Sequence, residues 1–146
     1  MKIAIIRDVK TPNRGTEASA GLDFYVPNDY DGRTVLKPGE SILIPSGIRA
    51  NVPKGFMLTA FNKSGISMKK SLIVGAAVVD EDYQGEIHIH LLNAGWLDAI
   101  FAPGDKIVQF ILVPVSYANV EVVENINLFE NVSERGVGGF GSTGTK

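Results

Sequence analysis

Short segments in which apolar and polar residues alternate, or in which a few apolar residues follow one another, recur along most of the chain. This pattern is typical of β-strands, and turn residues such as Pro38-Gly39 and Pro103-Gly104 separate the segments. The expected strands are residues 3–6, 22–26, 34–36, 41–45, 48–52, 56–61, 72–74, 76–79, 85–92, 107–115 and 120–123. Short strands at such regular spacing predict an all-β fold, namely a sandwich, jelly roll or barrel.

One segment, residues 64–70, departs from the β pattern. It begins with Ser64, a residue type that caps helix N-termini, and ends with Lys69 and Lys70, which suit a helix C-terminus. We therefore expect one short helix in an otherwise all-β chain.

The chain changes character at residue 131. Five of the sixteen residues 131–146 are glycine and only three are apolar, which is too few to bury the surface that ordering requires. We therefore divide the chain into a β domain, residues 1–130, and a flexible arm, residues 131–146. The arm is either an end without function or a segment that folds over a ligand. Arg135 and Phe140 favour the second interpretation, because a guanidinium group binds anions and an aromatic ring stacks on a flat group attached to the anion.

Composition narrows the range of functions. A chain of 146 residues suffices for one domain, and its formal net charge of −2 argues against nucleic-acid binding driven by positive charge. The absence of cysteine excludes disulfides, Cys–Zn sites and a thiol nucleophile. No apolar run approaches the roughly 20 residues of a membrane span, and the first residues lack the apolar stretch of a signal peptide. We expect a soluble, cytoplasmic protein.

Two segments have features of anion sites. Residues 136–141, GVGGFG, match the pattern GxGxxG. No strand precedes them and too few residues follow for a helix, so a dinucleotide-binding turn is excluded and only phosphate contact by the backbone remains. Lys63-Ser64-Gly65 stands at the start of the expected helix, where free N–H groups and a lysine attract phosphate, although an ordinary helix cap explains the same residues.

Acidic side chains are concentrated in residues 80–86. Such a turn is commonly just solvated, but Asp80 directly follows an apolar run, so we expect it to be partly withdrawn from water and able to act as a general base. His88 and His90 lie on one strand face; without a third ligand, a polar face explains them better than a metal site. Trp96 is expected in the core or at a subunit contact.

Five segments stand in an order that resembles the five motifs of the trimeric dUTP pyrophosphatases (dUTPases). They are AGLD (20–23), KSG (63–65), VVDEDYQGE (78–86), PGDKIVQF (103–110) and RGVGGFGSTG (135–144). The resemblance implies a β jelly-roll homotrimer whose three active sites are each built from several subunits. It also implies hydrolysis of dUTP to dUMP and pyrophosphate, with Mg²⁺ held through substrate phosphates and waters and by no protein ligand directly.

The resemblance further implies roles for individual residues. Asp80 corresponds to the carboxylate that activates the attacking water, and Tyr83 to the ring that packs on deoxyribose and excludes a 2′-hydroxyl. Asp23 corresponds to an acid that supports its neighbours. The residues implied in substrate binding are Lys63, Ser64, Gly65, Val74, Ala77, Val78, Tyr83, Gln109, Arg135, Phe140, Gly141, Ser142 and Thr143.

Three positions depart from the family pattern. The second motif usually begins with Arg and here begins with Lys63, which cannot form a bidentate bond to phosphate. Ala77 stands where Gly is usual, three residues before Asp80, and Val74 stands where some relatives have Asn. Base recognition is therefore expected to rest on the backbone of residues 74–78.

Two alternatives to dUTP hydrolysis remain open. A dCTP deaminase-like enzyme shares the fold, but the DEDYQG turn with Tyr83 and the complete arm motif favour a dUTPase. A regulatory protein that keeps the fold as a nucleotide-gated binding surface would not need Asp80 as a general base.

Overall fold

A computed structural model describes residues 1–139 of the chain. Its contacts divide the chain into a compact unit, Met1–Ser116, and a second unit, Tyr117–Lys146. The sequence pattern predicts this boundary after residue 130. We propose that a functional arm still begins near residue 131, within the second unit.

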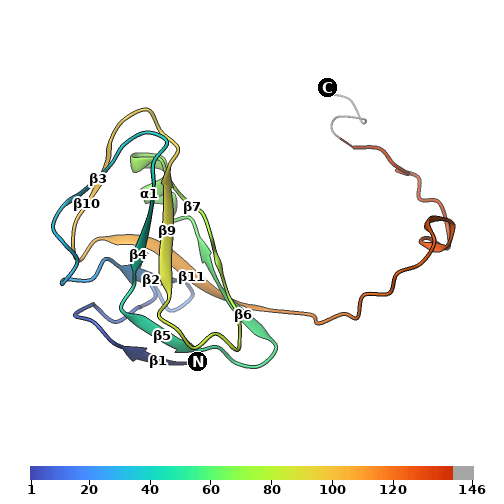
Figure 1. Cartoon of the computed structure of the whole chain (residues 1–146), viewed down its shortest axis with the longest axis horizontal. Helices are drawn as coiled ribbons and strands as arrows, with labels where there is room; N and C mark the ends of the chain where they lie inside the picture. The colour runs from blue at the N-terminus through green and yellow to red at the C-terminus, as the bar shows by residue number, and fades with distance from the viewer. Residues whose placement is uncertain (140–146) are drawn as a thin grey trace. The chain divides into compact units, whose positions relative to one another are not determined.

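Antiparallel sheets make up the first unit (Figure 1). The largest pairs β2 (Leu22–Tyr25), β11 (Lys106–Pro114), β6 (Phe56–Phe61) and β8 (Val78–Val79) in that order. A three-stranded sheet contains β4 (Ser41–Pro45), β9 (His88–Asn93) and β7 (Leu72–Val74). Two ribbons complete the unit, β1 (Lys2–Ile5) with β5 (Ile48–Asn51) and β3 (Thr34–Leu36) with β10 (Ala99–Phe101). The helix α1 (Ser64–Lys70) connects β6 to β7.

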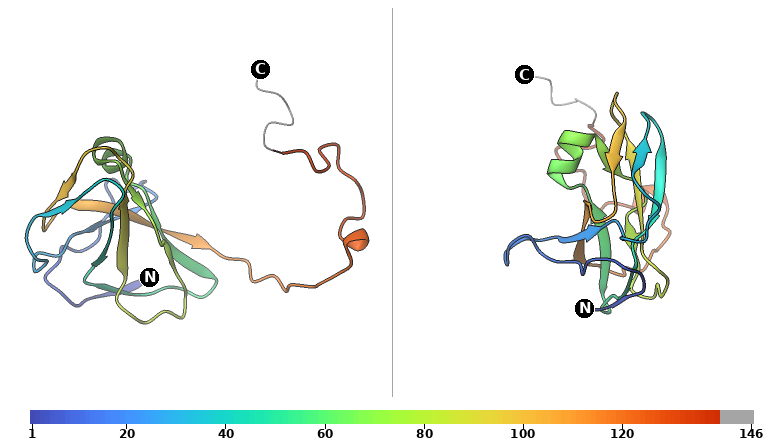
Figure 2. Two further views of the ribbon diagram at one scale, coloured as in Figure 1. Left: turned by 45° about the horizontal axis from the view of Figure 1, so that its top comes forward. Right: turned by 90° about the vertical axis from the view of Figure 1, so that its left-hand side faces the viewer.

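The two larger sheets face each other across the hydrophobic core (Figure 2). Phe110 of β11 and Phe24 of β2 are both buried, with ring centroids 4.5 Å apart. From the opposite sheet, Ile89 and Leu91 of β9 are each 1% exposed. Successive strand residues point to opposite faces, so the alternation in the sequence becomes one buried and one outward face.

Most of the strand predictions are confirmed, because all but one overlap an observed strand. β10 was not predicted, although its three residues, Ala99, Ile100 and Phe101, are all apolar. Residues 120–123, predicted as a strand, form none in the described chain. Val120 and Val122 are more than 90% exposed. Alternating apolar and polar residues give a segment an apolar face, but a strand also needs a neighbouring strand that hydrogen-bonds to its backbone N–H and C=O groups.

Two further expectations are wrong in detail. The helix begins at Ser64 as predicted, but Lys63 is its N-cap and no side chain caps it. Trp96 is 96% exposed and so is not a core residue in the single chain; a subunit contact for it stays a prediction.

The second unit is described for residues 117–139. It contains a 3-10 helix, η1 (Asn125–Asn127), and a turn in which the Gly136 N–H donates to the Ser133 carbonyl at 3.0 Å. Across the described part of the chain, no helix has the length and apolar character to cross a membrane.

Candidate active site

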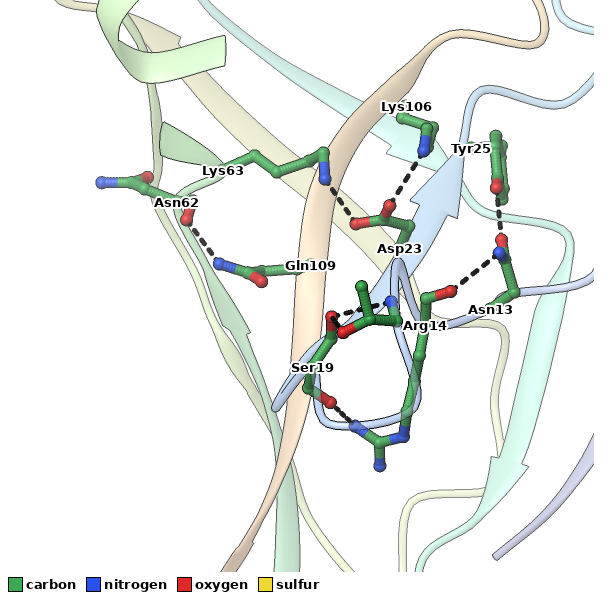
Figure 3. A network of polar contacts seen from close by, with 10 residues as sticks. Asn13, Arg14, Ser19, Asp23, Tyr25, Asn62, Lys63, Lys106 and Gln109 are labelled. Atoms are coloured by element: carbon green, nitrogen blue, oxygen red, sulfur yellow. Dashed lines mark hydrogen bonds and ion pairs between the residues drawn. The ribbon is translucent and has the colours of Figure 1, made fainter. Parts of the chain in front are cut away.

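Asp23 of β2 is the centre of a polar cluster (Figure 3). Only 4% of it is exposed, and its two carboxylate oxygens accept hydrogen bonds from Lys63 Nζ at 2.6 Å and Lys106 Nζ at 3.2 Å. Burial by itself would raise the pKa of Asp23, but the hydrogen bonds from the two lysines outweigh it and hold the pKa below its ordinary value. Two partly exposed cations against one carboxylate leave the cluster positively charged, as an anion site requires.

Gln109 of β11 lies beside this cluster, in register with Asp23. Its Nε2 donates to the Asn62 carbonyl at 2.9 Å. Gly21 leaves room for the glutamine, because a Cβ at Gly21 would lie 2.9 Å from the Gln109 Cβ and closer still to its Oε1. The AGLD, KSG and PGDKIVQF motifs therefore meet through direct contacts in one chain.

Ser64 and Gly65 are exposed at the start of α1. The first N–H groups of a helix have no partner within it, and no described atom lies within 4 Å of a Cβ built on Gly65. The KSG motif thus leaves its backbone donors accessible next to Lys63.

A second group of predicted residues lines a depression of about 200 Å³ beside β8. The segment from Ala76 to Asp80 forms one wall, Tyr83 another, and Ile87 and Phe110 its apolar part. Asp80 directly follows β8 and is exposed, so the expectation that it is partly withdrawn from water is wrong for the single chain. A larger hollow of about 420 Å³ lies beside β1 and β5, but Asp80 does not border it.

The ring of Tyr83 is fixed by contacts within its own turn. Its hydroxyl donates to the Glu86 carbonyl at 2.9 Å, and its N–H donates to the Asp80 carbonyl at 3.3 Å. A Cβ at Gly85 would come within 2.6 Å of Tyr83 Cζ, so the ring needs the glycine. The hydrogen bond from Arg7 lowers the pKa of the Glu86 carboxyl. The same bond attaches the end of the turn, at Glu86, to Arg7. The turn therefore presents Asp80 and a fixed ring to one depression.

The hairpin between β7 and β8 is anchored at both ends. At its start, the Val74 N–H donates to Asn62 Oδ1 at 2.7 Å. At its end, the Ala77 carbonyl accepts a hydrogen bond from the Ala60 N–H at 2.8 Å. Within the described residues, the carbonyl of Ala76 and the N–H of Ala77 have no hydrogen-bonding partner. The hairpin therefore offers one free backbone acceptor and one free backbone donor, which point in opposite directions because they are the two ends of one trans peptide unit. Val78, which follows it, turns its exposed side chain outward.

The two groups of residues do not line one cavity. The register places Gln109 opposite Asp23 on β2 and Phe61 on β6, so these three side chains project from the same face of the four-stranded sheet. Phe110, the next residue, projects from the other face into the core and lines the depression that Asp80 borders. This depression includes none of Asp23, Lys63 and Gln109.

The arm contributes one described residue of the predicted site. Arg135 is exposed, and its Nε donates to the Gly138 carbonyl at 2.9 Å. The other predicted arm residues, Phe140, Gly141, Ser142 and Thr143, lie outside the described residues.

Comparison with known proteins identifies the family. Residues 7–144 match the family model for dUTPase. The chain is 37% identical over 141 residues to the deoxyuridine 5′-triphosphate nucleotidohydrolase of Pseudomonas paraeruginosa, with 94% of this chain and 89% of that protein covered. This chain belongs to the dUTPase family.

Solved dUTPases share its fold. A dUTPase variant of Staphylococcus bacteriophage 80alpha, solved with dUpNHpp, has a TM-score of 0.84 at 23% identity, covering 98% of this chain and 97% of that one. A dUTPase variant from phage phi11 of S. aureus, described with a structural Mg(II) ion, has a TM-score of 0.74 at 20% identity, covering 84% and 95%. The all-β, jelly-roll expectation is therefore confirmed.

Three residues that support this dUTPase site are absent from the predicted set. Lys106 lies within the PGDKIVQF motif, Asn62 directly precedes KSG, and His90 accepts a hydrogen bond from the hairpin. In the sequence, only the position of these three residues within or next to the motifs indicated that they contribute to the site. In the described residues, no three His, Cys, Asp or Glu side chains are grouped to hold an ion.

Proposed function

We propose that this dUTPase hydrolyses dUTP to dUMP and pyrophosphate, with Asp80 as the general base for attack of water on the α-phosphate. The observation that carries this proposal is the exposed Asp80 carboxylate at the rim of a depression walled by a backbone hairpin. A general base must reach both a water molecule and the bound substrate. Asp80 can do so because it follows β8, whose pairing with β6 holds its position.

The hairpin between β7 and β8 would recognise the base. A uracil ring presents an N–H donor between two carbonyl acceptors, so the free Ala77 N–H can donate to a uracil carbonyl and the free Ala76 carbonyl can accept from the ring N–H. The two groups are the ends of one trans peptide unit and point in opposite directions, so one of them would face the base. The side chains of Val74 and Ala77 add no polar group, so recognition would rest on the backbone.

Tyr83 would select the sugar. Its ring is held in the turn by the hydrogen bond from its hydroxyl to the Glu86 carbonyl, and the lack of a side chain at Gly85 leaves room for it. A ring held against the sugar leaves no space for a 2′-hydroxyl, so the enzyme would act on dUTP and not on UTP.

Lys63, Ser64, Gly65 and Gln109 would bind the phosphates, together with the arm residues from Arg135 to Thr143. The cluster around Asp23 supports this role, because it places two lysines beside the exposed N–H groups of α1. Lys63 would act as a point charge, since its ammonium is already bound to Asp23.

The side chains of the site fit a magnesium ion that arrives on the substrate. Both oxygens of Asp23 are taken by lysines, and the described residues contain no cage of metal ligands. Mg²⁺ commonly uses few protein ligands and binds substrate phosphates instead. Such an ion neutralises phosphate charge, while Lys63 and Lys106 orient the triphosphate.

We propose that the active protein is a homotrimer with active sites shared between subunits. The depression that Asp80 borders includes none of Lys63, Ser64, Gly65 and Gln109 of the same chain, so one substrate would meet both halves of the site across a subunit boundary. The outward face that carries Gln109 also exposes Phe61 (45%) and Val78 (60%). Exposed apolar groups of this kind mark protein interfaces.

Product analysis tests the reaction. The purified chain should release pyrophosphate from dUTP in the presence of Mg²⁺, and far more slowly from dCTP, dTTP and UTP. Ammonia release from dCTP would instead indicate the deaminase alternative, and nucleotide binding without turnover would indicate the regulatory one.

Mixed oligomers test the sharing of sites. Asp80→Asn and Gln109→Ala alter opposite halves of the proposed site, so each should lower turnover alone. After unfolding and refolding together in equal amounts, about a quarter of shared sites should contain two intact halves and regain activity. No recovery above the separate variants would contradict sharing, and light scattering independently reports the trimer.

A further inference from the structure

His90 of β9 lies directly against the hairpin between β7 and β8. Its Nδ1 accepts a hydrogen bond from the Ala76 N–H at 2.8 Å, and its carbonyl accepts one from the Gly75 N–H at 2.9 Å. One residue therefore holds two consecutive amides of the hairpin, one through its side chain and one through its main chain.

Gly75 shows how closely the imidazole approaches the hairpin backbone. A Cβ at this position would lie 2.5 Å from His90 Cε1 and closer still to Nδ1, and 2.8 Å from Leu92 Cδ1. Any side chain at Gly75 would displace the ring. The glycine and the histidine thus form a matched pair, in which one supplies the space that the other fills.

The hydrogen bond to Ala76 fixes which backbone groups the hairpin can offer. The N–H groups of Gly75 and Ala76 are bound to His90 and the Ala77 carbonyl is bound to Ala60, so the groups of Ala76 and Ala77 that remain without a partner in the described residues are the Ala76 carbonyl and the Ala77 N–H. Without the Nδ1 acceptor, the Ala76 N–H would be unpaired as well, and the peptide unit to which it belongs could rotate. The peptide unit that carries the Ala76 carbonyl and the Ala77 N–H follows directly, so a rotation at Ala76 would change the directions of the groups proposed to read the base.

We propose that His90 is a positioning residue that orients the base-reading hairpin through its Nδ1. This role rests on the proposed function, in which the hairpin reads uracil. Nδ1 can accept only when it carries no proton, so the neutral ring is protonated on Nε2. His90 acts on base binding and selectivity, and not on the proton transfer, because its hydrogen bonds to the hairpin go to Gly75 and Ala76 and not to Asp80.

Two substitutions separate the acceptor from the bulk of the ring. His90→Leu keeps a side chain of similar size but has no acceptor, whereas His90→Asn places an amide oxygen as many bonds from Cβ as Nδ1. His90→Leu should raise the KM for dUTP about tenfold, the cost of one lost hydrogen bond, with kcat within about twofold. It should also reduce the preference for dUTP over dCTP. His90→Asn should restore most of both.

Amide exchange and ring-nitrogen NMR on the protein measure the same contact without turnover. The Ala76 amide should exchange slowly in the wild type and His90→Asn but rapidly in His90→Leu, and wild-type His90 should show an unprotonated Nδ1. A proton on Nδ1, an unchanged KM in His90→Leu, or a His90→Asn variant that behaves like His90→Leu would each overturn the proposal. A wild type that does not hydrolyse dUTP would instead refute the proposed function and with it the base-reading role; slow Ala76 exchange would then show only that His90 orders the hairpin.

Discussion

Replacing Asp23 with asparagine tests the cluster on which the phosphate half of the site is built. The buried carboxylate accepts hydrogen bonds from Lys63 and Lys106, and a charged hydrogen bond contributes about 1.5–3 kcal/mol. The lysine side chains are 28% and 46% exposed, so solvent screening reduces this contribution, most of all for Lys106. In Asp23→Asn the new amide N–H₂ faces one lysine and loses that bond. We expect the free energy of unfolding to fall by about 2 kcal/mol.

The pH dependence of this loss has a defined sign. The pKa of Asp23 is lower in the folded protein than in the unfolded chain, so its stabilising contribution is complete above the unfolded value of about 3.9 and is lost as the pH falls through the folded pKa. The wild type should therefore be more stable than Asp23→Asn at pH 7. The difference should shrink as the pH falls below about 4.

Urea unfolding at several pH values and one fixed protein concentration measures this difference, because an oligomer's stability depends on its concentration. Asp8→Asn is the matched control. Asp8 is exposed and accepts one side-chain hydrogen bond, from Asn28 at 3.1 Å, so its substitution should change stability by less than about 0.5 kcal/mol. The reasoning is refuted if Asp23→Asn unfolds at the wild-type urea concentration, or if the difference between them does not depend on pH.

Three further substitutions test the catalytic assignments. Asp80→Asn should lower kcat for dUTP by about 10²–10⁴ with little change in dUTP affinity, and single-turnover kinetics with near-wild-type rates would exclude Asp80 as the base. Tyr83→Ala should lose activity on dUTP and narrow the ratio of kcat/KM for dUTP over UTP; an unchanged ratio would place ribose exclusion elsewhere. Deleting residues 135–146 should leave Tm almost unchanged, because these residues lie outside the compact unit, but should reduce kcat/KM severely. Normal turnover by the truncated chain would show that the arm has no part in catalysis.

The sequence predicts those features that neighbouring residues determine. Alternation of apolar and polar positions locates most strands, because one face of each is buried, as for Ile87, Ile89 and Leu91. Asp80 was singled out because it directly follows an apolar run, and Tyr83 because the resemblance assigns it a role, and the two residues lie three positions apart in one motif. The order of the motifs indicated the family, which the comparisons confirm.

The local sequence pattern does not predict which strands pair with each other. Residues 120–123 have the pattern of a strand but no partner in the described chain, whereas β10 has a partner in β3 and almost no pattern. Pairing depends on which edge is available, and that is a property of the whole sheet.

What the sequence alone determined is therefore most of the strands, the short helix and the motifs, because each depends on residues a few positions apart. Only the tertiary structure decided that Asp23 binds Lys63 and Lys106, that Gly21 makes room for Gln109, and that His90 holds the hairpin. The tertiary structure also decided which face of the sheet each residue of β11 lies on, so that neighbouring residues of this strand project from opposite faces. These contacts join segments far apart in the chain, and they depend on strand order and register, which no local pattern of side chains specifies.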